Sequence, residues 1–256
     1  MEKCKMQIEE FFIEDDFLVR TSGTSDGTQD KFFKDGLWFK LDRYGGEGIA
    51  ETVASIILEE SGLDSSKFVK YTPCLINGKS GCYSKNFLNE DESFITFYRL
   101  FKNVTGRDLA ELCSKMDYDD AIEYVISFVK QQTNLDIREY LANTFALDKV
   151  ILNDDRHFNN MGIIFDGTNF KTAPIFDNGK SFLIGNKKAK KFESISEKIK
   201  TAFAKCFSPS FEMNERYLQK YQTIAITSES LTKIQKVFNN ENSEIVKVLK
   251  ETLHGY

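Results

Sequence analysis

In the first hundred residues, hydrophobic positions are spaced as in β-strands, except at residues 49–63. Residues 31–41, KFFKDGLWFKL, place an apolar run on each side of Asp35-Gly36, which predicts a β-hairpin. Residues 49–63 instead repeat apolar positions at helical spacing, and predict a helix that ends at Gly62. The aromatic and β-branched run at residues 93–101 predicts a buried strand. The N-terminal part is therefore expected to be rich in strands.

Helical spacing dominates the second half of the chain. Residues 118–129 and 135–150 predict two amphipathic helices, and residues 211–253 repeat the pattern. A strand-rich part followed by a helix-rich part indicates an α+β fold with two lobes, an N-lobe at residues 1–100 and a C-lobe at residues 101–256.

A second hairpin is expected inside the helical half. Residues 161–165 and 170–176 are strand-like and flank Asp166-Gly167. Pairing across this turn places Asn160 and Asp177 at the same end of the hairpin. With Asp155 nearby, these side chains offer hard oxygen ligands for Mg²⁺ and a spare carboxylate. The alternative is an ordinary polar turn, since Asn and Asp are common turn residues. We interpret His157 as an orienting hydrogen-bond partner.

The first hairpin carries two cations that face each other. A two-residue turn at Asp35-Gly36 puts Lys31 directly opposite Lys40. The repulsion is relieved if an anion lies between or beside the two ammonium groups. The alternative is a solvated sheet face with two snorkelling lysines.

A loop rich in glycine and hydroxyl residues, TSGTSDGTQD, precedes this hairpin. Glycines allow backbone N–H groups to approach phosphate oxygens, and hydroxyls add donors. The loop matches neither common phosphate-binding pattern, so a flexible surface loop is the alternative, but its position beside Lys31 and Lys40 favours phosphate binding. The candidate residues are Ser22, Gly23, Thr24, Ser25 and Gly27.

The order of these features follows the parts of a phosphotransferase related to protein kinases. Glu51 lies at the start of the helix after Lys40, where a carboxylate can pair with the lysine, although an exposed position is the alternative. The phosphate loop, strand lysine and helix glutamate are followed by Asp155, Asn160 and Asp177. This order implies ATP and Mg²⁺ as cofactors.

Composition and charge argue against a nucleic-acid-binding or membrane-spanning protein. The 256 residues are 41% hydrophobic, and the net charge is −5 with both signs dispersed, so no basic face for direct nucleic-acid binding is expected. No window approaches 18 apolar residues, and no signal peptide is evident, so we expect a cytoplasmic protein without a membrane span. The scattered cysteines indicate reduced thiols.

Two segments resemble the HipA-like serine/threonine kinases. They are NDDRHFNNMG, residues 153–162, with Asn-x-Asp-x-His-x-x-Asn spacing, and APIFD, residues 173–177. The resemblance extends over roughly residues 20–250 and is strongest over residues 140–180. It implies a two-lobed protein-kinase-like fold that transfers the ATP γ-phosphate to a serine or threonine of a protein substrate.

The resemblance also implies roles for individual residues. Asp155 would position or deprotonate the acceptor hydroxyl, and Asn160 and Asp177 would bind Mg²⁺. Lys40 would contact the α- and β-phosphates with Glu51 as its partner. The adenine-contacting hinge would lie at residues 97–100, with Phe97 and Tyr98 as candidates.

The phosphate loop begins at about residue 21, which leaves no room for the additional N-terminal subdomain of full-length HipA proteins. The resemblance is therefore to the compact, CtkA-like or split-toxin type, and the expected partners are an antitoxin or a separate protein that supplies this subdomain. Autophosphorylation at Ser22 or Ser25 is expected to inhibit, because it adds negative charge where ATP phosphates bind. A small-molecule or lipid kinase and a pseudokinase-like binding module remain alternatives.

Overall fold

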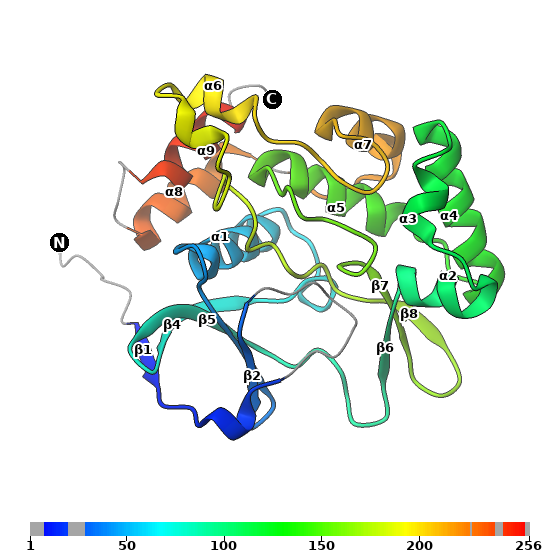
Figure 1. Cartoon of the computed structure of the whole chain (residues 1–256), viewed down its shortest axis with the longest axis horizontal. Helices are drawn as coiled ribbons and strands as arrows, with labels where there is room; N and C mark the ends of the chain where they lie inside the picture. Colours follow the sequence, from blue (N-terminus) through cyan, green and yellow to red (C-terminus); the bar gives the residue numbers. More distant parts are fainter. Residues whose placement is uncertain (1–7, 20–28, 226, 239–242, 254–256) are drawn as a thin grey trace.

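The computed structural model describes residues 8–19, 29–225, 227–238 and 243–253 (Figure 1). A five-stranded sheet forms the N-terminal part, in the order β1-β4-β5-β3-β2. β1 is parallel to β4 and the other pairs are antiparallel. The strands are β1 (Glu9–Phe11), β2 (Lys31–Lys34), β3 (Leu37–Leu41), β4 (Tyr71–Ile76) and β5 (Lys79–Lys85).

The hairpin predicted at residues 31–41 is confirmed, with its register. Lys34 pairs with Leu37 and Lys31 lies opposite Lys40. Asp35 and Gly36 both have positive φ, of 51° and 75°, as a tight hairpin turn requires. Lys31 and Lys40 therefore face each other across the hairpin, as the sequence predicted.

Helix α1 (Glu47–Glu60) packs on β4 and β5 and separates the sheet from the C-terminal helices (Figure 1). The prediction of a helix ending at Gly62 is confirmed, since the residue after α1 caps it and Gly62 has a φ of 78°. The helix is buried over most of its length, so its polar side chains must find partners inside the protein.

A three-stranded sheet of β6 (Ser93–Thr96), β7 (Gly162–Phe165) and β8 (Phe170–Thr172) lies beside the helices. The strand predicted over residues 93–101 is confirmed for residues 93–96 and wrong for residues 97–101. Helix α2 (Phe97–Thr105) begins inside it, because the Thr96 hydroxyl accepts the Arg99 N–H at 3.0 Å and caps the helix. At Gly162 a β-carbon would lie 2.3 Å from the Ile95 carbonyl oxygen, so glycine allows β6 and β7 to approach.

The C-terminal part is helical, as expected. Its helices are α3 (Leu109–Cys113), α4 (Tyr118–Thr133), α5 (Arg138–Ile151), α6 (Ile195–Ile199), α7 (Phe211–Leu218), α8 (Ser228–Phe238) and α9 (Glu244–Leu253). Short 3₁₀ turns are η1 (Asp15–Phe17), η2 (Ser65–Lys67), η3 (Ala189–Lys191) and η4 (Gln219–Tyr221). None of the helices in the described part of the chain is long and apolar enough to cross a membrane.

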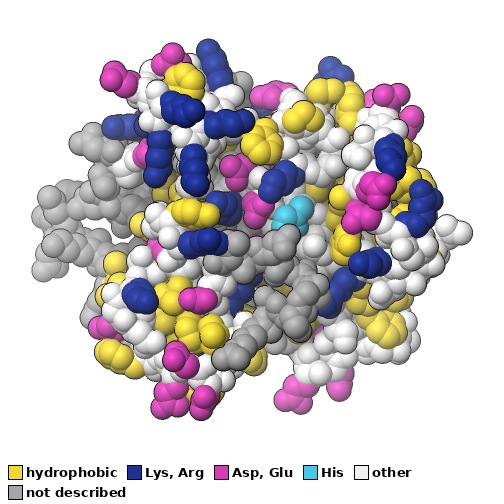
Figure 2. Space-filling view, viewed as in Figure 1, with side chains coloured by type: hydrophobic (Ala, Val, Ile, Leu, Met, Phe, Trp, Pro, Cys, Tyr) yellow, Lys and Arg dark blue, Asp and Glu magenta, His cyan; other side chains and the backbone are white. Residues whose placement is uncertain are grey.

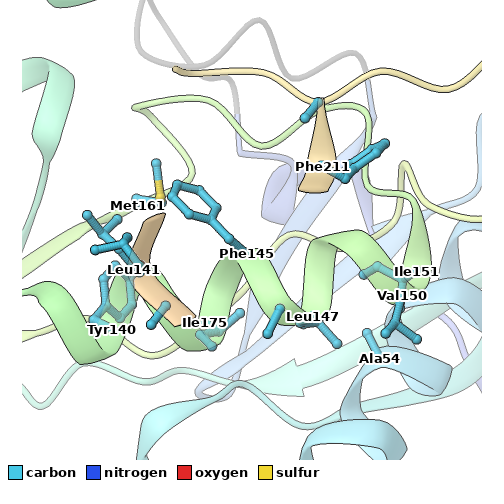
Figure 3. Packing of buried hydrophobic residues seen from close by; sticks show 14 of the residues in the cluster. Ala54, Tyr140, Leu141, Phe145, Leu147, Val150, Ile151, Met161, Ile175 and Phe211 are labelled. Carbon is cyan, nitrogen blue, oxygen red and sulfur yellow. The ribbon is translucent and has the colours of Figure 1, made fainter. Parts of the chain in front are cut away.

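Helix α5 is the centre of the main hydrophobic core. Figure 3 shows its side chains on several faces, among them Phe145, Leu147 and Val150, all nearly inaccessible to solvent. Ala54 of α1 belongs to the same cluster, and α1 contacts α5. Burying such side chains contributes about 1.5–3 kcal/mol each. One continuous core therefore holds α1 against the C-terminal helices and fixes the position of residues on both.

Candidate active site

Lys40 ends in a buried ion cluster. Its Nζ donates to Glu51 Oε1 at 2.6 Å and to Asp177 Oδ1 at 2.8 Å, and lies 4.8 Å from the centre of the Tyr71 ring. The residue is only 7% exposed. Burial lowers the pKa of Lys40, but the charges of Asp177 and Glu51 outweigh it and raise that pKa well above its usual value. Lys40 is therefore a permanent cation at this point.

Glu51 joins α1 to the segment that contains Asp177. It is buried, with Oε1 bonded to Lys40 while Oε2 accepts the backbone N–H of Asn178 at 2.8 Å. Both carboxylate oxygens are thus satisfied, as a buried charge requires. The exposed position that the sequence left open for Glu51 does not occur.

Asp177 supplies the negative charge that the two facing lysines require. Burial raises its pKa, but the charges of Lys40 and Lys31 outweigh this, and the pKa falls far below the usual range. Asp177 has a φ of 62°, in the left-handed region. The repulsion between Lys31 and Lys40 is therefore relieved, at least in part, by a carboxylate of the chain itself.

Asp155 lies in the loop that follows α5. The helix ends at Leu152, which has a φ of 53°, and the chain then turns. The N–H of Asp155 donates to Asn153 Oδ1 at 3.1 Å, and its carbonyl oxygen accepts Asn160 Nδ2 at 3.0 Å. Asp155 and Asn160 are thus bound to each other by a hydrogen bond, five residues apart.

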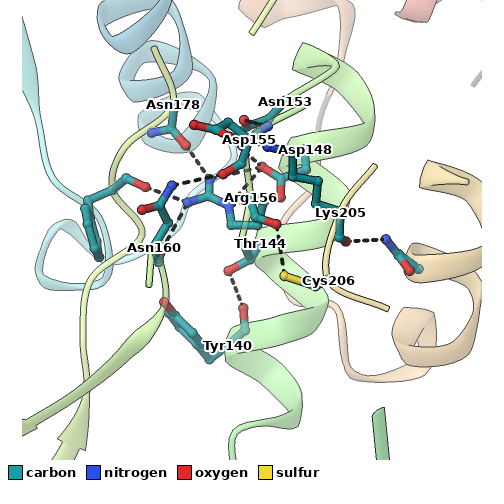
Figure 4. A network of polar contacts seen from close by, with 12 residues as sticks. Tyr140, Thr144, Asp148, Asn153, Asp155, Arg156, Asn160, Asn178, Lys205 and Cys206 are labelled. Carbon is teal, nitrogen blue, oxygen red and sulfur yellow. Dashed lines mark hydrogen bonds and ion pairs between the residues drawn. The ribbon is translucent and has the colours of Figure 1, made fainter. Parts of the chain in front are cut away.

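Arg156 connects this loop to the Asp177 segment (Figure 4). It is 2% exposed and pairs with Asp148 of α5, with Nε 3.0 Å from Oδ2. Its other nitrogens donate to the Phe176 carbonyl oxygen at 2.5 Å and to Asn178 Oδ1 at 2.6 Å. The sequence analysis missed Arg156, Asp148 and Asn178. An arginine inside an otherwise apolar strip was the one available signal, because such a charge is buried only with partners.

The second hairpin differs from its prediction at one end. The pairing of Phe165 with Phe170 forms, but β8 stops at Thr172 and does not extend through residues 173–176. Ile175 instead bridges Phe68. Asn160 and Asp177 are therefore not brought together by a strand ladder. Arg156 holds the two segments, since its Nη1 also lies 3.4 Å from the Asn160 carbonyl oxygen.

The donor set fits a magnesium ion. Asn160 uses Nδ2 on the Asp155 carbonyl and retains Oδ1, while Asp177 uses Oδ1 on Lys40 and retains Oδ2. An amide oxygen and a carboxylate oxygen are hard ligands, and Mg²⁺ commonly takes one or two carboxylates with substrate phosphates and water. Among the described residues, no three His, Cys, Asp or Glu side chains gather as a cation site.

A cavity of about 220 Å³ opens beside Lys40. Phe87, Phe94 and Phe176 pack against one another along it, with ring centroids 5.4–5.8 Å apart. Flat apolar walls with a cation at one end suit a ligand that has an aromatic ring and phosphate groups. Its described lining is Lys31, Trp38, Lys40, Val69, Tyr71, Ser84, Asn86, Phe87, Leu88, Phe94 and Phe176.

Phe97 and Tyr98 do not line this cavity. Both lie in α2, where Phe97 packs against Tyr140 and the Tyr98 hydroxyl bonds Asp108. Residues 97–100, where the adenine-contacting hinge is expected, lie in the first turn of α2, and the cavity is lined instead by residues between β5 and β6, among them Phe87 and Leu88.

His157 has an environment that fits a supporting role. Burial lowers its pKa although the charges of Asp155 and Asp177 oppose the change. Its Nδ1 accepts the Asn159 N–H at 3.3 Å. The residues of the predicted phosphate loop, Ser22, Gly23, Thr24, Ser25 and Gly27, lie outside the described residues.

Known proteins resemble this chain in overall fold. No family model and no curated protein matches the sequence. The crystal structure of the Helicobacter pylori proinflammatory kinase CtkA superimposes with a TM-score of 0.62 at 17% identity, covering 93% of this chain and 90% of that one.

The Shewanella oneidensis toxin HipA, solved with HipB and its operator DNA, superimposes with a TM-score of 0.50 at 11% identity, covering 94% of this chain and 65% of that one. Similarity at these identities concerns the fold. The chain has a fold like that of CtkA and HipA, as the sequence resemblance implied.

Proposed function

We propose that this protein is an ATP- and Mg²⁺-dependent serine/threonine protein kinase. The observation that carries the proposal is Lys40, which is held between Glu51 and Asp177 at the charged end of an apolar cavity. A buried lysine–glutamate pair between a strand and a helix, next to a metal-binding aspartate, is the arrangement that protein kinases use to hold ATP phosphates. The fold shared with CtkA and HipA supports the same conclusion.

Each residue of the cluster has a role in this proposal. The aromatic cavity takes the adenine ring, and Lys40 binds the α- and β-phosphates. Asn160 and Asp177 would hold Mg²⁺, which would neutralise charge on the phosphate oxygens. Lys40 exchanges part of its contact with Asp177 for phosphate when ATP arrives.

Asp155 acts on the acceptor. The acceptor hydroxyl oxygen forms a bond to the γ-phosphorus while the bond from that phosphorus to the β–γ bridging oxygen breaks. ADP leaves with the electron pair of the broken bond, and the hydroxyl proton passes to the Asp155 carboxylate and then to water. The Asp155 side chain is 34% exposed, so a protein side chain can reach it.

Two regulatory features extend the proposal. Ser22 and Ser25 are candidates for inhibitory autophosphorylation, because a phosphate there would repel those of ATP. HipA was solved in a toxin–antitoxin complex with HipB, and we extend to this chain the role of a toxin that an antitoxin partner controls. Growth arrest on expression that Asp155→Ala abolishes would support that role.

The test is phosphate transfer by the purified chain. Wild-type protein, Asp155→Ala and Asp177→Ala are incubated with γ-labelled ATP and Mg²⁺, and the intact masses are measured. Asp91→Ala, which removes an exposed turn carboxylate, is the matched control. We expect label in wild type and control alone. Absence of label together with no nucleotide-induced rise in melting temperature would contradict the proposal.

A further inference from the structure

Lys205 lies beside the carboxylate that the proposed mechanism uses. Its Nζ forms an ion pair with Asp155 Oδ1, across 50 residues of sequence. The two side chains are 37% and 34% exposed, so the pair is open to solvent. The function proposed above assigns no role to Lys205.

The backbone of Asp155 is fixed more firmly than its side chain. Asn153 accepts its N–H and Asn160 donates to its carbonyl oxygen. Within the residues that the structure describes, Lys205 makes the hydrogen bond to the carboxylate itself. Backbone contacts leave both side-chain torsions of an aspartate free, so Lys205 determines where the carboxylate oxygens point.

Lys205 is itself held in place by its neighbours (Figure 4). Its carbonyl oxygen accepts Asn214 Nδ2 at 3.4 Å, and Asn214 is buried. The next residue, Cys206, has a φ of 75° and its thiol donates to the Arg156 carbonyl oxygen at 2.9 Å. A residue other than glycine keeps a left-handed conformation only where its surroundings enforce it, and such residues gather at functional sites.

Stability does not account for this arrangement. An ion pair between side chains that are about one-third exposed contributes little to folding, because water screens both charges. The loop nevertheless brings Lys205 to the carboxylate that takes the acceptor proton in the proposed mechanism. The contacts of Cys206 and Asn214 thus act to place a cation at Asp155.

We propose that Lys205 is a positioning residue for Asp155. It holds Oδ1 and leaves Oδ2 directed toward the acceptor hydroxyl. Lys205 neither gives nor takes a proton, and the bonds that form and break are those of the transfer to the hydroxyl described above. The inference rests on the proposed kinase function.

The test compares Lys205→Ala and Lys205→Arg with wild type in the full chain. Lys200→Ala, an exposed lysine of the same segment, is the matched control. We expect Lys205→Ala to lower kcat about 100-fold, the effect of a misplaced reacting group, with the KM for ATP within about twofold. Lys205→Arg should recover activity to within about tenfold of wild type, because guanidinium also donates to a carboxylate.

A double-mutant cycle separates positioning from general damage. In the Asp155→Ala background, Lys205→Ala should change the residual rate less than about twofold, because the two residues act as a unit. Full additivity of the two losses would overturn the inference. So would equal losses in the Ala and Arg variants accompanied by a lower melting temperature, which would indicate a structural role.

Different outcomes would overturn the role of Lys205 and the proposed kinase function. If wild type is active and Lys205→Ala keeps kcat within about twofold, the inference is overturned and the kinase function stands. If folded wild type transfers no phosphate and nucleotide does not raise its melting temperature, the proposed function is overturned and the inference with it.

Discussion

Glu51 Oε2 accepts the backbone N–H of Asn178 at 2.8 Å, which attaches α1 directly to the residue after Asp177. The other oxygen of Glu51 holds Lys40. One carboxylate thus fixes the strand lysine, the helix and the proposed metal-binding segment relative to one another. The proposed phosphoryl transfer would require this assembled arrangement of the three groups.

Replacing Glu51 should lower kcat/KM for ATP more than it lowers the stability of the fold. Glu51→Gln keeps a side chain of the same size but removes one of the two charges that hold Lys40. We expect kcat/KM for ATP to fall about 10- to 100-fold, because the ammonium is no longer fixed at the phosphates. Steady-state kinetics and the nucleotide-induced shift in melting temperature provide the measurement. Glu60→Gln, at the exposed end of α1, is the control, and an equal effect of both variants would contradict the prediction.

Removing Arg156 should destabilise the protein. Arg156→Met leaves the buried Asp148 carboxylate without its cation and the Phe176 carbonyl oxygen without its donor. We expect the free energy of unfolding in urea to fall by about 3–5 kcal/mol. The double variant Arg156→Met with Asp148→Leu should regain part of this loss, because no buried charge is left unpaired. A loss below about 1 kcal/mol would show that water or other groups replace the arginine.

The raised pKa of Asp154 predicts that the stability of the folded protein depends on pH. Burial and the nearby charge of Asp155 raise its pKa from the usual 3.8 to about 6, against the effects of Lys180 and Lys205. Between these two values the folded state binds more protons than the unfolded state, so stability contributed by this group falls as pH rises from 4 to 6.

Asp154→Asn should therefore stabilise the protein by about 3 kcal/mol at pH 7 and have little effect below pH 4. Urea unfolding of both proteins at pH values from 4 to 8 provides the measurement. A pH-independent difference would indicate that the variant acts through packing and not through charge.

The lysines around η3 should affect the use of acidic acceptors. Figure 2 shows Lys and Arg side chains gathered over α6 and α9, and the exposed lysines before α6 are Lys187, Lys188, Lys190 and Lys191. Replacing these four with Gln should raise the KM for an acidic acceptor such as casein about 3- to 10-fold without changing kcat, because the charges steer association.

Raising the ionic strength should reproduce this effect in wild type and not in the variant, since salt screens exposed charges. A basic acceptor such as histone is the matched comparison. An unchanged KM for casein would favour the alternative of a solvated loop without a role in binding.

Much of the local structure follows from the sequence. The turn at Asp35-Gly36 set the register that places Lys31 opposite Lys40, and the period of apolar positions identified α1, α4 and α5. These features depend on neighbours in sequence, so backbone preference and side-chain period are sufficient to predict them. The start of α2 was missed because one hydroxyl, that of Thr96, overrides the strand preference of the run around it.

The sequence by itself determined which polar residues stand at the ends of strands and helices, and hence the candidates Lys40, Asp155 and Asp177. Only the tertiary structure decided how they are held. The contacts of Arg156 with Asp148 and of Lys205 with Asp155 join residues from separate elements, and neither pair has a sequence spacing that marks it. Such contacts arise when a common core brings distant segments together and a buried or facing charge must find a partner of opposite sign.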